Sequence, residues 1–264
     1  MRIAVVTLLA LVLLAGCGGS GHLRSEPGAA QPHRAAPLRV PRHSLVRGSC
    51  DVASTIRATA DRSYAALVRG DAAIRTAPAG GRVLVRVARL DVNGYPTVLG
   101  VLGVRPARHG CRAAAYRVQL PTPPNGRSGW IDAGAVRVFA VRNRIVVDLS
   151  ARRLTAYRAG APALRVPVAV GASSTPTPTG RYVVDERWLL ENANGPFGIA
   201  ALGISAHSAV LRDWVQGGPI ALHGTNEPWS IGRAASHGCV RLRNADMRRL
   251  LRLAPAGTPV VIRR

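Results

Sequence analysis

The stretch Ser236-His237-Gly238-Cys239-Val240-Arg241, with Leu222-His223-Gly224-Thr225 upstream of it, decides what fold and chemistry this sequence encodes. The two segments supply one thiol, two imidazoles and glycines where backbone must approach a reacting group. A cysteine attacks a carbonyl as its thiolate, so a base must take the thiol proton, and histidine titrates in the range that suits this task. The combination is typical of an enzyme that transfers acyl groups through a cysteine.

Cys239 is therefore the predicted nucleophile, and the two histidines are the candidate bases. His237 stands two residues from Cys239 in the sequence, which places both side chains on one side of an extended segment, whereas His223 reaches the thiol only through folding. We interpret His223 as the base. A tetrahedral intermediate also needs backbone N–H donors for its oxyanion, and a glycine before the nucleophile allows the close approach. The amides of Gly238 and Cys239 are the predicted oxyanion hole.

The two segments resemble the signature of the L,D-transpeptidases, the YkuD-type family of enzymes that crosslink peptidoglycan. The resemblance runs from about residue 144 to residue 264 and keeps its order along the chain. Besides the two segments it includes Val170-Gly171, Thr175-Pro176-Thr177-Pro178-Thr179-Gly180, Gly203-Ile204-Ser205 and Gly257-Thr258-Pro259-Val260. A single Ser-His-Gly-Cys would be modest evidence, but the ordered set is strong.

This resemblance implies a role for each residue of the motif. Cys239 would be the nucleophile, His223 the base, and Gly224 the donor of a backbone carbonyl that orients the imidazole. Arg241 is the candidate to bind a substrate carboxylate. The residues expected around the substrate are Ser236, His237, Arg241 and Thr225, with Gly238 beside them. The implied fold is a β-sandwich with a short helix, and it needs no metal or cofactor.

The implied reaction is a crosslink between peptidoglycan stem peptides. Cys239 would attack the carbonyl of the third residue of a donor tetrapeptide, expel the terminal D-alanine and hold a thioester. An amine of a neighbouring stem peptide would then take the acyl group and give a 3→3 crosslink. Carbapenems resemble the acylating substrate of this family, so they are the expected inhibitors.

Other interpretations stay open at this stage. Cys239, His237 and His223 could be three ligands of a zinc site, although the usual Cys-x-x-Cys and His-Glu-x-x-His spacings are missing. The cysteine could be an inert thiol in a packed turn, which would leave a wall-binding lipoprotein without activity. The same acyl-enzyme released by water would make the protein an L,D-carboxypeptidase.

The N-terminus predicts export. Arg2 precedes an apolar stretch over residues 3–15, which is shorter than the roughly 20 residues of a membrane-spanning helix. It ends in Leu14-Ala15-Gly16-Cys17, which resembles a bacterial lipobox. Residues 1–16 would then be a lipoprotein signal peptide, and a lipidated Cys17 would anchor the protein to the outer face of the cytoplasmic membrane. An ordinary cleaved signal would instead release it into the wall.

Residues 17–49 are rich in Gly, Pro, Ala, Arg and Ser and are predicted to be a flexible tether. Of the four cysteines, a lipid carrier and a nucleophile account for two, which leaves Cys50 and Cys111. In an oxidising compartment these two are expected to pair. A bridge of this span is worth roughly 4 kcal/mol on the chain-entropy model.

The remaining chain is long enough for two modest domains, and we place the boundary near residue 141. Residues 71–75, 83–87, 97–101 and 116–120 are short β-rich runs between Gly, Pro and Asn turns, so residues 50–140 are predicted to be a small SH3-like β-barrel. The apolar spacing in residues 51–68 favours a short helix.

Residues 141–264 are the predicted catalytic domain, and the whole protein is predicted to be mainly β. Residues 145–149 and 153–157 read as a hairpin, while 164–170 and 182–184 continue the sheet. Two prolines make 175–180 a rigid turn rather than a central strand. Residues 244–253 read as a helix with Asn244 as its N-cap.

The net charge of +23 is extreme, and every one of the 36 basic residues is arginine. Basic proteins often bind nucleic acid. Export and an aromatic content of only 4% argue against nucleic acid here. Anionic cell-wall polymers are the expected partners.

Overall fold

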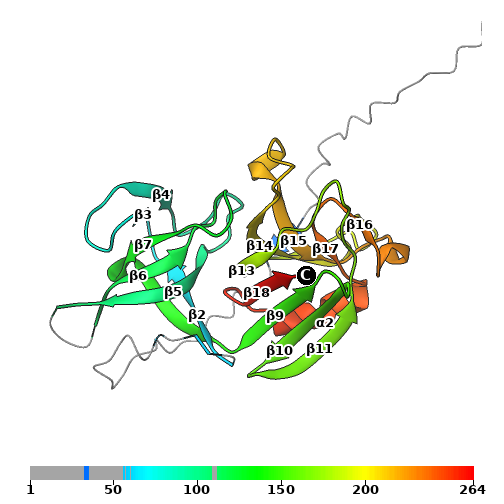
Figure 1. The fold of residues 1–264 in the computed structure, drawn as a ribbon, viewed down its shortest axis with the longest axis horizontal. Helices are drawn as coiled ribbons and strands as arrows, with labels where there is room; N and C mark the ends of the chain where they lie inside the picture. Colours follow the sequence, from blue (N-terminus) through cyan, green and yellow to red (C-terminus); the bar gives the residue numbers. More distant parts are fainter. Residues whose placement is uncertain (1–32, 36–55, 57, 60, 109–111) are drawn as a thin grey trace, which may run out of the picture. The chain divides into compact units, whose positions relative to one another are not determined.

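The computed structural model describes residues 33–35, 56, 58–59, 61–108 and 112–264 (Figure 1). Over these residues the protein is mainly β, as predicted, with one α-helix. The predicted signal peptide, Cys17, Cys50 and Cys111 lie outside the described residues. Of the predicted tether, only β1 (His33–Ala35) is described, and it pairs antiparallel with β13 (Gly180–Leu190). Within the described chain, no helix has the length and apolar character needed to cross a membrane.

The larger sheet belongs to the C-terminal half of the chain and has the strand order β11-β10-β9-β18-β13-β14-β15-β17 (Figure 1). The predicted hairpin is present as its strands β9 and β10, which pair antiparallel. Strands β12 and β16 form a separate two-stranded parallel sheet, and Ala169, just before β12, exchanges backbone hydrogen bonds with Arg241 of β17. The strands not yet bounded are β9 (Asn143–Asp148), β10 (Arg153–Arg158), β11 (Ala161–Pro167), β12 (Val170–Gly171), β14 (Ala200–His207), β15 (Pro219–His223), β16 (Ala234–Ser236), β17 (Val240–Arg241) and β18 (Pro259–Arg263).

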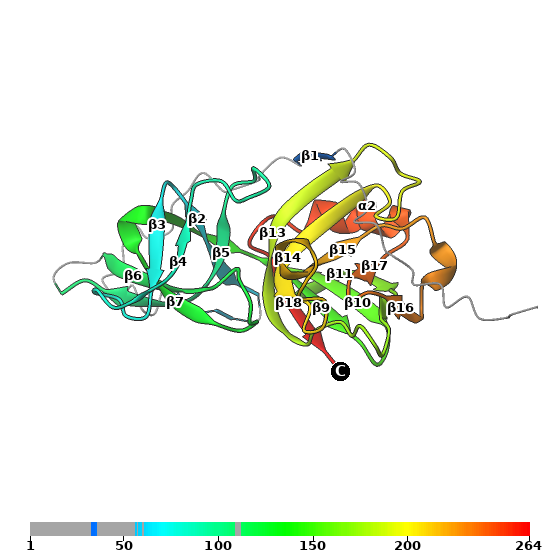
Figure 2. The ribbon, with the colours of Figure 1, turned by 90° about the horizontal axis from the view of Figure 1, so that it is seen from above.

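The long strand β13 joins two halves of this sheet. Its first residues, Gly180–Val183, pair with β18, and its later residues pair with β14 (Figure 2). Apolar side chains from both halves meet in one core, as a β-sandwich requires. Leu154 and Val260 line the core from one half, and Leu202 and Leu222 line it from the other.

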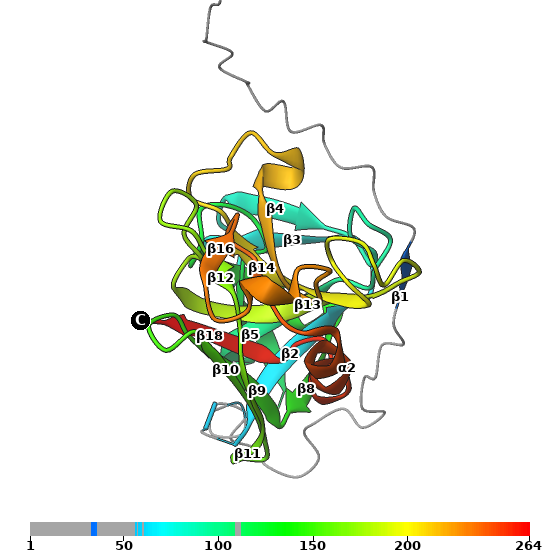
Figure 3. The ribbon, with the colours of Figure 1, turned by 90° about the vertical axis from the view of Figure 1, so that its right-hand side faces the viewer.

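The helix α2 (Asn244–Leu253) follows the motif and packs against β14, β10 and β11 (Figure 3). Met247 and Leu250 are its buried residues, and both belong to the sandwich core. The predicted range of the helix is confirmed, but the prediction of Asn244 as N-cap is wrong. Arg243 holds the N-cap position without a side-chain bond, and the Asn244 Oδ1 accepts instead from the N–H groups of Thr225 and Ile199.

The N-terminal half forms an antiparallel sheet of seven strands with its own apolar core, in the order β4-β3-β7-β6-β5-β2-β8. The four predicted β-rich runs lie in β3, β4, β5 and β6, and the SH3-like topology stays a prediction. The helix predicted within residues 51–68 is wrong for its last part, which is the strand β2. The strands are β2 (Ser63–Val68), β3 (Ala72–Arg75), β4 (Val83–Val87), β5 (Val98–Pro106), β6 (Ala113–Gln119), β7 (Ser128–Asp132) and β8 (Val136–Val141).

Candidate functional site

The motif residues gather on one face of the parallel strand pair β15 and β17. Leu222 pairs with Val240 and His223 pairs with Arg241. Side chains alternate along a strand, so Leu222 and Val240 point into the core, where both are fully buried, while His223 and Arg241 point to the opposite face. Cys239 directly precedes β17, and its Sγ accepts a hydrogen bond from the Ala221 N–H at 3.4 Å. The folding that His223 needs to share a face with the thiol is therefore strand pairing.

His223 is buried and held by its neighbour in the sequence. Its Nδ1 lies 2.5 Å from the Gly224 carbonyl oxygen. Because a carbonyl oxygen only accepts, Nδ1 carries the proton, which leaves Nε2 with a free lone pair. The Phe197 ring packs edge-on against the imidazole, with ring centroids 4.8 Å apart. The contact with the Gly224 carbonyl is the one expected if that carbonyl orients the imidazole. With the proton on Nδ1, Nε2 is unprotonated, as a general base requires.

Burial sets the protonation of the two candidate catalytic groups. It lowers the pKa of His223 to about 4, with the Gly224 carbonyl opposing this shift and the Arg241 charge adding to it. Burial also raises the pKa of the Cys239 thiol, while the Ala221 N–H and the Arg241 charge act against that rise. Both directions disfavour a charged form. At neutral pH these pKa shifts favour a neutral thiol and a neutral imidazole.

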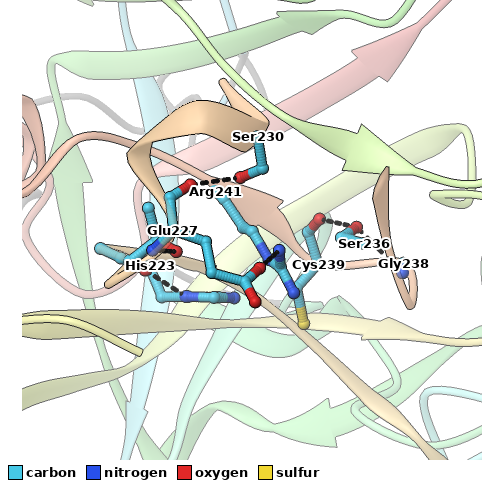
Figure 4. A network of polar contacts seen from close by, with 9 residues as sticks. His223, Glu227, Ser230, Ser236, Gly238, Cys239 and Arg241 are labelled. Atoms are coloured by element: carbon cyan, nitrogen blue, oxygen red, sulfur yellow. Dashed lines mark hydrogen bonds and ion pairs between the residues drawn. The ribbon is translucent and has the colours of Figure 1, made fainter. Parts of the chain in front are cut away.

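The turn before the nucleophile is stabilised by Ser236. This buried side chain donates to the Cys239 carbonyl oxygen at 2.5 Å and accepts from the Gly238 N–H at 3.2 Å (Figure 4). Gly238 has φ +117, a conformation that L side chains rarely adopt, and an added Cβ would lie 3.0 Å from Ile220 Cδ1. These contacts explain both the serine and the glycine of the motif.

The predicted oxyanion hole is divided between an engaged amide and a free one. The Gly238 N–H is bonded to Ser236 Oγ, so it would have to exchange that partner for an oxyanion. The Cys239 N–H has no hydrogen-bond partner among the described residues. Of the two predicted donors, the Cys239 amide is the one available in this structure.

Arg241 has a partner that sequence reasoning missed. Its Nη1 lies 2.5 Å from Glu227 Oε2, and the Arg241 side chain is mostly buried, with 16% exposed (Figure 4). A substrate carboxylate, the ligand predicted for Arg241, would have to share this guanidinium with Glu227. Thr225 is buried, and its hydroxyl accepts from the Glu227 N–H at 2.9 Å, so it shapes the loop that carries Glu227.

Asn244, which was predicted to be the N-cap of α2, has a different role in the structure. Its Oδ1 accepts from the Thr225 N–H at 3.1 Å and from the Ile199 N–H at 3.4 Å. An added Cβ on Gly224 would lie 2.2 Å from that oxygen, which explains the glycine after the histidine. Asn244 thus connects the start of α2 to the segment that holds His223.

His237 takes no part in this cluster. Its side chain is exposed, and its ring lies 5.8 Å from that of Trp214, centroid to centroid. The described residues include His223, His237 and Cys239, and no group of three or more metal-ligating side chains is found among them. The geometry gives the zinc interpretation no support.

Two kinds of comparison bear on the family. The model of the YkuD family, the L,D-transpeptidase catalytic domain, matches residues 142–262. A Bacillus licheniformis protein named as an L,D-transpeptidase, YkuD, is 35% identical over 150 residues, which cover 54% of this chain and 83% of that protein. The chain belongs to the YkuD-type L,D-transpeptidase family.

A second curated relative and a solved structure align as well. The Bacillus subtilis YkuD protein is 35% identical over 126 residues, covering 48% of this chain and 69% of its own length. A solved L,D-transpeptidase from Mycobacterium tuberculosis is 18% identical, with a TM-score of 0.39, over 59% of this chain and 70% of that one. The predicted family of this chain is therefore confirmed by the relatives, while the roles of single residues stay predictions.

Proposed function

We propose that this L,D-transpeptidase forms 3→3 crosslinks in peptidoglycan through a Cys239 thioester. The observation that supports it most is the shared strand face, on which His223, with its Nδ1 tied to the Gly224 carbonyl, lies with the Cys239 thiol. The arrangement has the order of a nucleophile, a base and an orienting group. Family membership supplies the substrate class, a stem tetrapeptide.

In the acylation step, Cys239 Sγ attacks the carbonyl of the third residue of the donor. Since thiol and imidazole are both neutral at rest, the proton moves to His223 Nε2 as the C–S bond forms. The imidazolium returns this proton to the leaving nitrogen, and D-alanine departs. The Cys239 N–H, with Gly238 if it releases Ser236, stabilises the oxyanion.

In the transfer step, an amine of a second stem peptide attacks the thioester. The C–N bond forms, the C–S bond breaks, and His223 carries the amine proton to the Cys239 sulfur. Carbapenems are proposed inhibitors because their strained lactam carbonyl offers the thiol the same reaction without a rapid second step.

The site of action that we propose is the cell envelope. Residues 1–16 and Cys17 support export and lipid anchoring, with secretion into the wall as the alternative. The net charge of +23 supports contact with anionic wall polymers.

The test is a product assay with the purified full chain and disaccharide tetrapeptide, read by mass spectrometry beside a Cys239→Ala variant. We expect crosslinked dimers from the wild type and none from the variant. Tripeptide as the sole product would make the protein an L,D-carboxypeptidase. Unchanged substrate in both samples would contradict the proposal.

A further inference from the structure

Glu227 presents a negative charge at the site of a strongly basic protein. Its side chain is 42% exposed, whereas the Arg241 side chain that it contacts is 16% exposed. Only Oε2 is used in this contact, and Oε1 has no hydrogen-bond partner among the described residues. A carboxylate has acceptor positions on both oxygens. Glu227 can therefore bind a second cationic group without releasing Arg241.

The loop holds this carboxylate in place. The Glu227 N–H donates to Thr225 Oγ1 at 2.9 Å, and the Glu227 carbonyl accepts from the Ser230 N–H at 3.0 Å and from Ser230 Oγ at 2.7 Å. Thr225 and Ser230 are both buried. The backbone of Glu227 is thus fixed by the loop and its carboxylate is held by Arg241, so a ligand would meet a preorganised carboxylate.

Glu227 also lies close to the reacting groups. Its partner Arg241 is two residues beyond Cys239, and it pairs with His223 on the neighbouring strand. The charge of Arg241 acts on the pKa of both groups. Figure 4 shows the Glu227 side chain extending from its loop toward Arg241, where His223 and Cys239 also point.

The acceptor of a transpeptidase is an alkyl amine, which is an ammonium ion at neutral pH. Arg241 alone would repel this cation, and so would the excess of arginine over the whole chain. Glu227 neutralises Arg241 and leaves one oxygen for the ammonium. Water, the competing nucleophile, gains nothing from this charge.

We propose that Glu227 binds the acceptor ammonium and so favours transfer to an amine over hydrolysis of the thioester; this inference rests on the proposed function. The bound ammonium releases one proton to solvent and becomes the nucleophile. It attacks the thioester carbonyl, the C–N bond forms and the C–S bond breaks. The second amine proton passes through His223 to the Cys239 sulfur.

The experiment measures, from one acyl-enzyme, the ratio of amide product to hydrolysed tripeptide. The full chain is acylated with disaccharide tetrapeptide and offered either diaminopimelate or hydroxylamine, an amine that is uncharged at neutral pH. We expect Glu227→Gln to lower the ratio for diaminopimelate about tenfold, as loss of a hydrogen bond to a charged group does, and to spare the ratio for hydroxylamine. Glu227→Asp should restore part of the loss. Glu191→Gln, the same change at an exposed glutamate at the end of β13, should keep the wild-type ratio.

An unchanged diaminopimelate ratio in Glu227→Gln would overturn the inference. So would an equal fall for hydroxylamine, because it would mean that the variant disturbs the loop rather than charge recognition. A wild-type protein that forms no thioester, seen as the absence of the acyl mass on Cys239, would instead overturn the proposed function, and this inference with it.

Discussion

The Nδ1 atom of His223 lies 2.5 Å from the carbonyl oxygen of Gly224, its neighbour in the sequence. The contact fixes the tautomer, and burial keeps the ring neutral. The Cys239 thiol is held neutral by burial as well. A neutral pair differs from a preformed thiolate–imidazolium pair in ways that can be measured.

Alkylation of Cys239 by iodoacetamide should show this difference. Since burial raises the pKa of the thiol, the thiolate fraction at neutral pH is small. We expect the alkylation rate, followed by mass spectrometry of the Cys239 peptide, to be low at pH 6 and to keep rising above pH 9. A high rate that is constant between pH 5 and pH 7 would show a preformed thiolate and contradict this prediction.

His223 should also make stability depend on pH. Burial lowers the pKa of His223 to about 4 in the folded protein, whereas its pKa in the unfolded chain is about 6.5. Between these two pH values the unfolded state therefore holds more protons than the folded state. The free energy of unfolding should therefore fall as pH drops through this window, by about 3 kcal/mol from this group.

Urea denaturation at pH 7 and at pH 4 measures the effect, with His223→Gln as reference. The variant lacks the titrating ring but keeps every carboxylate, so their contributions cancel in the comparison. The fall in the free energy of unfolding should be smaller in the variant than in the wild type. The same fall in both would show that His223 is not the group responsible.

Much of the site could be predicted because its chemistry is local in the sequence. The thiol, the histidines and their glycines stand in two short segments, and strand pairing of those segments is all that assembles them. Glu227 was missed because it is a single acidic residue in a loop between the segments, and only the fold brings it to Arg241. Asn244 was misread because an asparagine before a helix is a good N-cap, yet its amide is used by Thr225 and Ile199.

The fold was predicted well where apolar residues alternate and less well where they do not. Strand β2 lies between β5 and β8, and Tyr64, Ala65, Ala66 and Val68 are all buried. A strand that is covered on both faces has apolar residues on both sides, so apolar and polar residues no longer alternate along it. The spacing of three or four residues between Ile56, Ala60, Tyr64 and Leu67 is that of the apolar face of a helix, and it led to the wrong prediction.

Ser236→Ala should reduce both stability and acylation. The change removes one donor and one acceptor that stabilise the turn before Cys239, so we expect a loss of about 1–3 kcal/mol in the free energy of unfolding. Acylation by a carbapenem should slow tenfold or more, because the Cys239 carbonyl loses the hydrogen bond from Ser236 Oγ that fixes the Cys239 backbone. Ser205→Ala is the matched control: it removes a buried hydroxyl of β14 that accepts from the Val183 N–H and, in the described part of the chain, bonds to neither Cys239 nor His223. It should lower stability and leave acylation unchanged; slower acylation in both variants would mean that stability alone is responsible.

Asn244→Ala should displace His223 indirectly, because Asn244 bonds to the segment that holds His223 and makes no hydrogen bond to the imidazole itself. Its Oδ1 bonds to the N–H groups of Thr225 and Ile199, and the loss of this oxygen leaves both donors unpaired beside Gly224. We expect the protein to lose about 1–3 kcal/mol of unfolding free energy, measured in urea, and the carbapenem acylation rate to fall as the Gly224 carbonyl loses its position against His223. Asn192→Ala removes an exposed asparagine whose Oδ1 bonds only to the nearby Asn194 N–H, so it should change stability by less than about 0.5 kcal/mol and leave the rate unaltered. Acylation at the wild-type rate in Asn244→Ala would mean that the Gly224 carbonyl keeps its position without the hydrogen bonds to Asn244 Oδ1. Strand pairing alone would then position His223.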